Sequence, residues 1–286
     1  MKAALLAIML LFFCGCGEVN QRYITIAANT WIGYLPLAYA NEMGWLKKDH
    51  FILKWTHSLS ESKTLFRLGL CEGLCATQYE ILSEPKIKAK TLPYFFIDQS
   101  LGGDQILSNI PLQQLKKMPS IEVFLEFSSV NKALLDTFIK VYDIGGTLHL
   151  NDTTQDNIVQ MRFDKPTLVI SYEPYATFLR KKGFSMLASS KTLYKYIRIY
   201  DLFFGLKTLP VKKIGVLHKS FLKGVQQLQE HPRYFYEMVK KYIPHTSYEE
   251  FKKELKGIRW IKKPRPSDIS YLKSQGFDTS RLLTHP

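Results

Sequence analysis

The sequence predicts an α/β protein made of two lobes. Runs of β-branched and apolar residues alternate with amphipathic stretches, which is typical of a largely parallel sheet covered by helices. A second series of the same kind begins near Pro119. The chain has 286 residues, which is enough for two lobes that each bury a hydrophobic core.

The first series predicts strands and helices in strict alternation. Pro36 opens the first helix and Gly44 closes it, and Ser60 is the expected N-cap of the second helix. The strands are expected at residues 23–28, 51–55, 74–77 and 88–97, and the helices at residues 37–43, 60–70 and 79–83.

The second series repeats this pattern and is followed by a helical C-terminal part that begins after Leu217. Its strands are expected at residues 121–127, 147–150, 167–172, 186–187 and 196–204, and its helices at residues 131–141, 156–162 and 175–182. The C-terminal helices are expected at residues 218–230, 232–242 and 248–256.

Composition indicates a soluble globular protein with a basic surface. Hydrophobic residues make up 46% of the chain and charged residues 22%. The 39 Lys and Arg residues exceed the 25 Asp and Glu residues, so the formal net charge is +14. The basic residues are scattered and form no stripe with interleaved aromatics, so nucleic-acid binding is not expected. The charge favours a solvated surface close to anionic lipid headgroups.

The first 16 residues predict export. Lys2 precedes an unbroken apolar run at residues 3–13, which suits a signal peptide and is too short to span a bilayer. The run leads into Cys14-Gly15-Cys16, which resembles the lipobox of bacterial lipoproteins. That resemblance implies a signal peptide over residues 1–16 and a lipid on Cys16, in the periplasm or at the cell surface. Lipidation of Cys14, plain secretion and an uncleaved anchor are the alternatives.

Cys71 and Cys75 are four positions apart and leave two interpretations open. They are either two buried thiols or a disulfide that closes a small loop. A zinc site is not expected, because no second Cys or His pair lies nearby in the sequence.

Sequence motifs that would indicate catalysis are absent. The chain has no Gly-x-x-x-x-Gly-Lys-Ser/Thr loop, no Gly-x-Ser-x-Gly elbow and no His-Glu-x-x-His. We therefore expect a protein that is not an enzyme and that uses no cofactor or metal.

A recognisable pattern follows the first predicted strand. The motif Trp-x-Gly-Tyr-x-Pro-Leu-x-x-Ala at residues 31–40, with a Gly-Trp pair at 44–45, resembles the nitrate/sulfonate/taurine and thiamine-precursor-binding family of ABC transporter solute-binding proteins. Leu74 departs from the family pattern, and Tyr172 replaces the Trp of its Trp-Glu-Pro turn. Further segments match in the family's order, at residues 74–80, 97–104, 126–130, 171–175 and 199–201.

The resemblance spans about residues 23–260 and implies a type II periplasmic-binding-protein fold, with two α/β lobes joined by a two-strand hinge. Lobe 1 would comprise residues 20–107 plus 203–286, and lobe 2 residues 108–202. The implied protein is a monomer that binds a small molecule between its lobes and delivers it to an ABC permease in the inner membrane.

The implied ligand-binding residues lie at strand ends, where open α/β sheets bind ligands. They offer aromatic faces, neutral hydrogen-bonding groups, carboxylates, and serines that precede a helix. Asp98, Ser100 and Asp104 either line the cleft or fix the hinge turn. The full set is Trp31, Tyr34, Thr77, Gln78, Asp98, Ser100, Ser128, Ser129, Tyr172, Glu173 and Asp201.

Two ligand classes stay open at this point. The acidic and aromatic groups favour a nitrogenous ligand, cationic or heteroaromatic, such as a pyrimidine-like vitamin precursor. The net charge of +14 and the serines favour a sulfonate or nitrate.

Two other functions compete with solute binding. The first is a sensor or assembly lipoprotein that binds a membrane partner, which a filled or empty cleft would support. The second is an enzyme related to pyrimidine synthesis on the same fold, which would need a reactive His and Lys facing the cleft.

Overall fold

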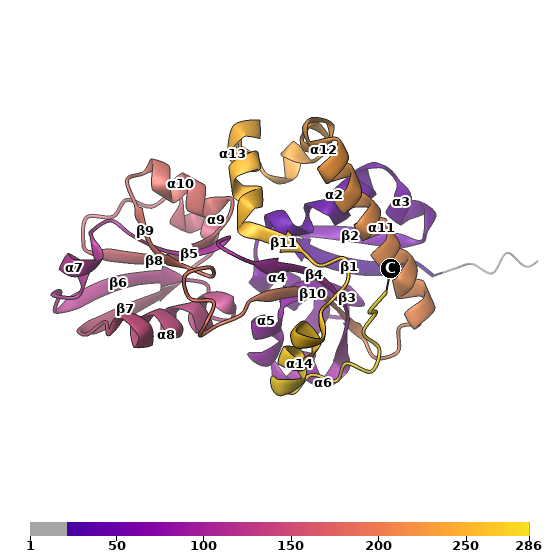
Figure 1. The fold of residues 1–286 in the computed structure, drawn as a ribbon, viewed down its shortest axis with the longest axis horizontal. Helices are drawn as coiled ribbons and strands as arrows, with labels where there is room; N and C mark the ends of the chain where they lie inside the picture. The colour runs from indigo at the N-terminus through magenta and orange to yellow at the C-terminus, as the bar shows by residue number, and fades with distance from the viewer. Residues whose placement is uncertain (1–21, 286) are drawn as a thin grey trace, which may run out of the picture.

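The computed structural model describes residues 22–285, and within them the chain forms two α/β lobes, each built on its own sheet (Figure 1). The signal peptide and the lipobox, with Cys14 and Cys16, lie outside the described residues. The first lobe holds a six-stranded sheet with the order β11-β4-β10-β3-β1-β2, and the second a five-stranded sheet with the order β7-β6-β8-β5-β9.

The strands of the first sheet come from both ends of the described chain. They are β1 (Ile24–Asn29), β2 (Phe51–Thr56), β3 (Gly73–Thr77), β4 (Thr91–Ser100), β10 (Tyr200–Leu206) and β11 (Ile258–Trp260). The second sheet is continuous in sequence, with β5 (Asp104–Ser108), β6 (Ser120–Leu125), β7 (Thr147–Asp152), β8 (Thr167–Tyr172) and β9 (Ser185–Ser189).

Helices connect and cover the strands in both lobes. In the first lobe they are η2 (Ile32–Tyr34), α2 (Leu35–Glu42), α3 (Trp45–Lys48), α4 (Leu59–Arg67), α5 (Gln78–Leu82), α6 (Pro85–Lys90), α11 (Val211–Glu230), α12 (Pro232–Val239), η3 (Lys240–Tyr242), α13 (Tyr248–Glu254), η4 (Leu255–Gly257) and α14 (Pro266–Ser274). In the second lobe they are α7 (Leu112–Leu115), α8 (Val130–Tyr142), α9 (Gln155–Ile158) and α10 (Tyr175–Lys181).

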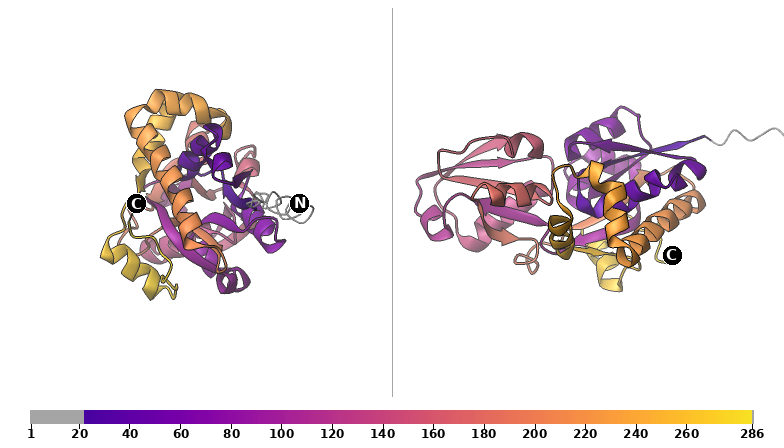
Figure 2. Two further views of the ribbon diagram at one scale, coloured as in Figure 1. Left: turned by 90° about the vertical axis from the view of Figure 1, so that its right-hand side faces the viewer. Right: turned by 90° about the horizontal axis from the view of Figure 1, so that it is seen from above.

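The chain crosses between the lobes twice, and Figure 2 shows the two bodies joined there. It leaves the first sheet after Ser100 and enters the second at Asp104, and it returns between Ser189 and Tyr200. These crossings lie a few residues before the boundaries expected at 107/108 and 202/203. Helix α13 also stands at the junction, where Glu250 forms an ion pair with Lys181 of α10 (Figure 1).

The expected parallel character is only partly present in the first sheet. β1 pairs in parallel with β2 and β3, whereas β10 runs antiparallel to β3 and β4, and β11 runs antiparallel to β4. The returning crossover strand and a strand of the C-terminal part cause this difference. In the second sheet β6 pairs in parallel with β7 and β8, and β5 runs antiparallel to β8 and β9.

Several element boundaries differ from the sequence-based expectation for local reasons. Helix α4 is capped by Ser58 and not by Ser60, because the Ser58 side chain accepts the backbone N–H of Glu61 three residues on. Pro85 opens a helix over residues that were expected to begin a strand. Helix α11 begins directly after Pro210, seven residues before the expected start, and residues 258–260 form an edge strand where a helical end was expected.

Cys71 and Cys75 are free, buried thiols. Burial raises the pKa of the Cys71 thiol to about 12, so it stays protonated and unreactive near neutral pH. Of the two interpretations left open by the sequence, the structure therefore supports buried thiols.

Helix α11 packs against α2 and covers one face of the first sheet, where Phe221 of α11 packs tilted against Phe95 of β4, which stacks on Phe203 of β10. Within residues 22–285, none of the helices is both long enough and apolar enough to cross a membrane.

Two glycines of α11 give a matched test of this packing. A Cβ at Gly224 would overlap the carbonyl of Pro36, whereas a Cβ at Gly215 would meet no atom within 4 Å. We expect Gly224→Ala to lower the free energy of unfolding by about 1–3 kcal/mol through overpacking. Gly215→Ala should raise it by up to about 1 kcal/mol, because alanine is the better helix former. Thermal unfolding of both variants checks this, and equal shifts of one sign would contradict the α2–α11 contact.

Candidate functional site: the cleft between the lobes

Most of the aromatic and acidic residues expected at the site meet where strand ends of the two sheets face each other. A cavity of about 20 Å³, the inner cavity, lies between the lobes. Its volume is about that of one water molecule. It is lined by Asn29, Trp31, Tyr34, Leu59, Thr77, Asp104, Val130, Tyr172 and Asp201.

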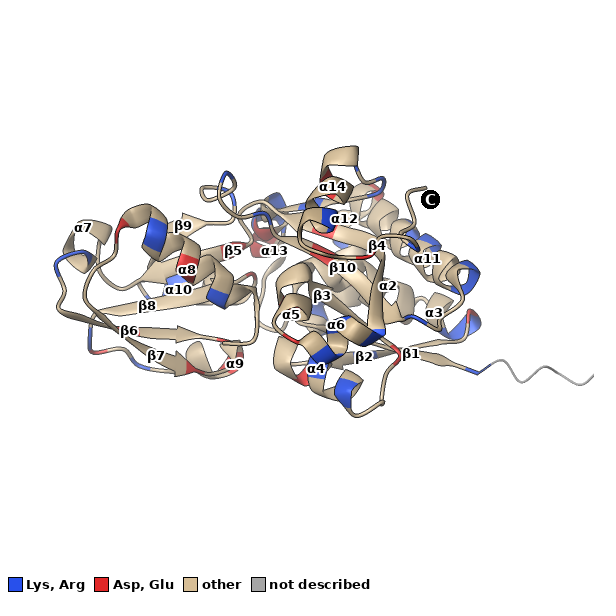
Figure 3. Cartoon of the chain, turned by 90° about the horizontal axis from the view of Figure 1, so that it is seen from below, with Lys and Arg blue, Asp and Glu red and all other residues tan. Residues whose placement is uncertain are grey.

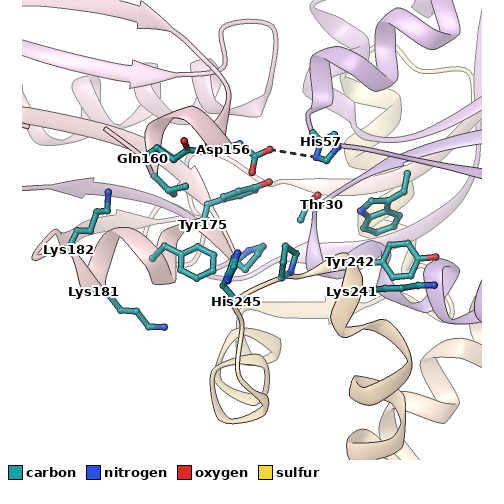
Figure 4. Close-up of a pocket in the computed structure, with 15 residues that line it drawn as sticks. Thr30, His57, Asp156, Gln160, Tyr175, Lys181, Lys182, Lys241, Tyr242 and His245 are labelled. Carbon is teal, nitrogen blue, oxygen red and sulfur yellow. Dashed lines mark ion pairs between the residues drawn. The ribbon is translucent and has the colours of Figure 1, made fainter. Parts of the chain in front are cut away.

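A much larger hollow, the outer groove, opens beside it and has a volume of about 680 Å³. Figure 4 shows Thr30 and His57 on one side facing Tyr175 and Asp156 on the other, with the His57–Asp156 ion pair at 3.8 Å crossing the gap. Its volume lies in the range of sites for drug-sized ligands. The remaining lining residues are Trp55, Val159, Gln160, Pro174, Phe178, Lys181, Lys182, Lys241, Tyr242, Pro244 and His245.

Trp31 and Tyr34 are held by buried carboxylates. The Trp31 indole Nε1 donates to Asp98 Oδ2 at 3.1 Å, and the Tyr34 hydroxyl donates to Asp201 Oδ1. Asp98 and Asp201 are register partners on β4 and β10, so the two carboxyls lie side by side. Asp98 itself sits behind Trp31 and is not part of the cavity wall.

Aromatic rings connect the inner cavity with the outer groove. Trp31 of lobe 1 meets Tyr172 of lobe 2 edge-on at 6.0 Å between ring centroids, and Tyr172 meets Tyr175 at 5.5 Å. Tyr172 also accepts a 3.3 Å hydrogen bond from Asn29 Nδ2. These contacts make the two lobes continuous across the cleft, and π faces line the inner cavity.

Burial raises the pKa of several carboxyls at the junction. It brings the pKa of Asp104 to about 7 and that of Glu126 to about 8. The pKa values of Asp98 and Asp201 are also raised, by burial and then by repulsion from neighbouring carboxylates. Figure 3 shows acidic segments near β5, β10 and α13 at the junction, and basic segments distributed over both lobes.

Two further polar contacts join the lobes, and a third holds the returning chain crossing. Glu80 of α5 accepts the backbone N–H of Val130, at the start of α8, at 2.6 Å, so a carboxylate of lobe 1 occupies the N-terminus of a lobe 2 helix. Lys63, which is fully buried, donates to the carbonyl oxygen of Ser128 and lies 3.6 Å from Glu84. Gln78 bonds to the backbone of Arg198 and Tyr200 at 2.6 and 2.9 Å.

The structure also shows which expected site residues lie away from the inner cavity. Ser100 Oγ bonds to Ser190 Oγ at 2.9 Å and accepts the N–H of Asp104, so it braces the crossing segments, as Gln78 does. Glu173 forms a 2.8 Å ion pair with Arg180 within lobe 2 and caps α10. Ser129 is the N-cap of α8, and Ser128 lines a separate hollow of about 290 Å³ beside Glu126.

Sequence reasoning missed several residues that the fold brings to the cleft. Asn29 is the last residue of β1 and Thr30 directly follows it, so the strand-end argument that selected Trp31 could have found them. Trp55, Tyr175 and Tyr242 reach the outer groove from three separate elements, and no local pattern signals this. No group of three or more His, Cys, Asp or Glu within residues 22–285 is placed to hold a metal ion.

The chain shares its fold with solved solute-binding proteins. The ligand-binding component of an ABC-type import system from Staphylococcus aureus, solved with zinc bound, has a TM-score of 0.68 at 11% sequence identity, over 89% of this chain and 90% of that chain. The periplasmic aliphatic sulphonate binding protein SsuA from Escherichia coli has a TM-score of 0.67 at 11% identity, over 90% and 85%.

A Candida albicans protein described as having the generic periplasmic binding protein structural fold has a TM-score of 0.65 at 11% identity, over 89% of this chain and 88% of that chain. The predicted periplasmic-binding-protein fold is therefore confirmed, and the resemblance drawn from the sequence holds at the level of the fold. No protein-family model matches the chain, and neither does any curated protein sequence.

The raised pKa of Glu126 predicts a pH dependence of stability. In the unfolded chain a Glu carboxyl titrates near pH 4.3, so between about pH 4.3 and 8 the folded state binds the extra proton. The free energy of unfolding therefore falls by up to about 1.4 kcal/mol per pH unit as the pH rises through this window. Glu126→Gln has no carboxyl at this position and should not lose this stability. The melting temperature of the variant, relative to that of the original protein, should therefore rise by several degrees from pH 5 to pH 8.

Glu122→Gln is the matched control, because Glu122 lies on β6, which ends one residue before Glu126, and is partly exposed beside Lys165. A difference between Glu126→Gln and the original protein that stays constant from pH 5 to pH 8 would contradict the buried, protonated carboxyl.

Proposed function

We propose that the protein is an extracytoplasmic solute-binding protein of an ABC importer. It binds a small nitrogen- or sulfur-containing molecule between its lobes and delivers it to a permease in the membrane. The observation that carries this proposal is the cleft itself, with strand ends of two independent sheets facing one another across two chain crossings. The fold shared with binding components of importers supports it.

The mechanism is closure around the solute. Direct lobe-to-lobe contacts at the inner cavity are few, and they include Asn29 with Tyr172 and Trp31 with Tyr172. A solute that touches both lobes only in the closed form shifts the open–closed equilibrium by its differential affinity for that form. The permease then distinguishes the loaded from the empty protein by lobe position.

We assign the ligand contacts to the residues of the inner cavity and the adjoining wall of the outer groove. Trp31, Tyr34 and Tyr172 supply aromatic faces, and Thr77 and Asp201 supply polar groups. Ser128 and Ser129 stand at the far edge of the cleft. Asp98, Gln78, Ser100 and Glu173 position these residues or brace the crossings.

One observation favours the competing function of a partner-binding sensor or assembly lipoprotein. The inner cavity has room for about one water molecule, because Trp31, Tyr34 and Tyr172 fill it. A cleft that stays filled would leave the closed form as the resting form and the lobes as a rigid surface for a membrane partner. The experiment below separates this function from solute binding.

The enzyme alternative has less support. His57, His245 and three lysines do line the outer groove. However, the Lys181 and Lys241 amines are paired with Glu250 and Glu42, and Lys182 donates to the carbonyl of Met161. A reactive amine would have to be released from such a contact before it could act.

A lipid on Cys16 would tether lobe 1 to the membrane only a few residues before β1 begins. We expect Cys16→Ser to shift the protein from the membrane fraction to the soluble fraction, because its acyl anchor would be lost. Cys14→Ser serves as the matched variant, and release by Cys14→Ser alone would assign the lipid to Cys14. Retention of the protein in the membrane by the double variant would contradict lipid anchoring.

A thermal-shift screen tests solute binding. A ligand that binds only the folded state stabilises it by mass action and so raises the melting temperature. At a ligand concentration of a hundred times the dissociation constant the stabilisation is about 2.7 kcal/mol. The panel holds nitrate, taurine, alkanesulfonates, thiamine and its pyrimidine precursors, riboflavin and polyamines. We expect at least one solute to raise the melting temperature. Trp31→Ala should weaken the affinity for that solute at least tenfold.

Tyr196→Ala is the matched aromatic control, because Tyr196 is 66% exposed and lines neither the inner cavity nor the outer groove. If no solute shifts the ligand-free protein, solute binding is wrong and the partner-binding function takes its place.

A further inference from the structure

We propose that the inner cavity binds the protonated nitrogen of an organic cation, such as a primary ammonium group, and excludes sulfonates and nitrate. This inference rests on the proposed solute-binding function and decides the charge of the ligand, which the sequence leaves open. It follows from which hydrogen-bonding groups at the cavity are already used and which are left over.

Three hydrogen-bond donors at the cavity are used within the protein. Trp31 Nε1 donates to Asp98, the Tyr34 hydroxyl donates to Asp201, and Asn29 Nδ2 donates to the Tyr172 oxygen. An anionic ligand needs several donors that converge on its oxygens. The side-chain hydroxyls of Thr77 and Tyr172 are left, and two neutral hydroxyls replace little of the hydration of an anion.

The helix N-terminus beside the cavity is also occupied. The N-terminus of α8 would be the natural place for an anionic group, since Val130 lines the cavity and Ser129 caps the helix. Instead Glu80 of the opposite lobe accepts the Val130 N–H at 2.6 Å. The protein's own carboxylate therefore takes the position that a sulfonate or nitrate would use.

The wall of the inner cavity also has hydrogen-bond acceptors that are free to bind a ligand. Asn29 is fully buried and lines the cavity, and its Oδ1 has no hydrogen-bond partner anywhere in residues 22–285. The carboxylates of Asp104 and Asp201 form part of the same wall, one from each sheet. Within the described chain, no Lys, Arg or His lines this cavity. An unpaired buried acceptor is costly, and a donor-rich cation would satisfy it.

Two basic side chains lie near the buried carboxyls of the junction, and both form hydrogen bonds with other residues. Burial raises the pKa of Glu80 and the charge of Lys63 lowers it in part, while the Lys63 amine donates to the Ser128 carbonyl. Burial likewise raises the pKa of Asp98 and the charge of Arg259 lowers it in part, while the Arg259 guanidinium donates to Gln99 at 2.6 Å. Neither side chain lines the inner cavity, so within residues 22–285 the carboxyls of its wall have no basic side chain in direct contact there, and a bound cation would supply a positive charge at that place.

Shape agrees with charge. Trp31, Tyr34 and Tyr172 are buried aromatic residues of the wall, a setting in which ring faces attract cations. A cavity of about 20 Å³ accepts an ammonium group, which is about the size of water, but not the three oxygens of a sulfonate. Thr30 and Tyr175 begin the apolar outer groove next to it, so the body of the ligand would extend there.

A matched set of probes tests the inference. Isothermal titration calorimetry is run on the purified protein with 2-phenylethylamine, 2-phenylethanol and 2-phenylethanesulfonate, and again with hexylamine, hexanol and hexanesulfonate. Within each set only the charged group changes. We expect each ammonium member to bind at least tenfold more tightly than its alcohol or sulfonate.

Variants then assign the site. Asp201→Asn should weaken ammonium binding at least tenfold, because it removes a carboxyl of the cavity wall that a bound cation would ionise and pair with. Asp104→Asn does the same from the opposite lobe and serves if Asp201→Asn fails to fold. Glu237→Gln is the control, since Glu237 lies exposed on α12, and its affinity for the ammonium probes should be unchanged.

The outcomes separate this inference from the proposed function. If a sulfonate or an alcohol binds as tightly as its ammonium counterpart, or if the ammonium probes fail while another solute of the wider screen binds, the cation inference is wrong and solute binding stands. If no compound of the two probe sets or of the wider screen binds, both are wrong.

Discussion

The lobe junction depends on two hydrogen bonds from aromatic side chains to buried carboxyls. Trp31 donates to Asp98, and Tyr34 donates to Asp201. Asp98 lies near the end of β4 and Asp201 near the start of β10, so each carboxyl stands beside one of the two chain crossings. Gly33 between the aromatics has no room for a side chain, because a Cβ there would overlap the Asp98 carboxylate. These contacts fix the turn after β1 against the hinge.

Burying these carboxyls disfavours their charged form, and other carboxyls at the junction show the same effect. Carboxyls removed from water favour their neutral form, which is why the pKa values of Asp98, Asp104, Glu126 and Asp201 are all raised. The protein carries a net charge of +14, yet within the described residues no Lys, Arg or His lines the inner cavity. The closed cleft is therefore a locally acidic, poorly hydrated site inside a basic protein, and net charge does not report on its ligand.

The two hollows of the cleft divide the tasks of recognition. The inner cavity is narrow, aromatic and rich in acceptors, whereas the outer groove is wide and largely apolar, with polar groups such as His57 and Asp156 at its wall. The edge contacts from Trp31 through Tyr172 to Tyr175 join them across the lobes. A ligand that spans both would bring the lobes together, whereas a cleft left filled by these rings would present a fixed surface to a partner.

The fold class and most of the helices and strands follow from local patterns in the sequence. The alternation of apolar strands and amphipathic helices is a local property, so the strand at residues 167–172 was predicted with the bounds that the structure has. Five of the residues expected at the site, Trp31, Tyr34, Thr77, Tyr172 and Asp201, line one cavity, because strand ends of the two sheets face each other there. Their contact with a ligand stays a prediction.

The hydrogen-bond partners of these side chains, and the cavity that they line, follow from the tertiary structure. A sequence shows that Glu80 and Ser129 are suited to helix N-termini, but not that Glu80 reaches the helix of the other lobe. It shows neither that Asn29 keeps an unpaired acceptor nor that Trp55 and Tyr242 meet at 4.9 Å between ring centroids beside the outer groove. Hydrogen-bond partners and cavity volume depend on contacts between residues far apart in the chain, and no local pattern encodes them.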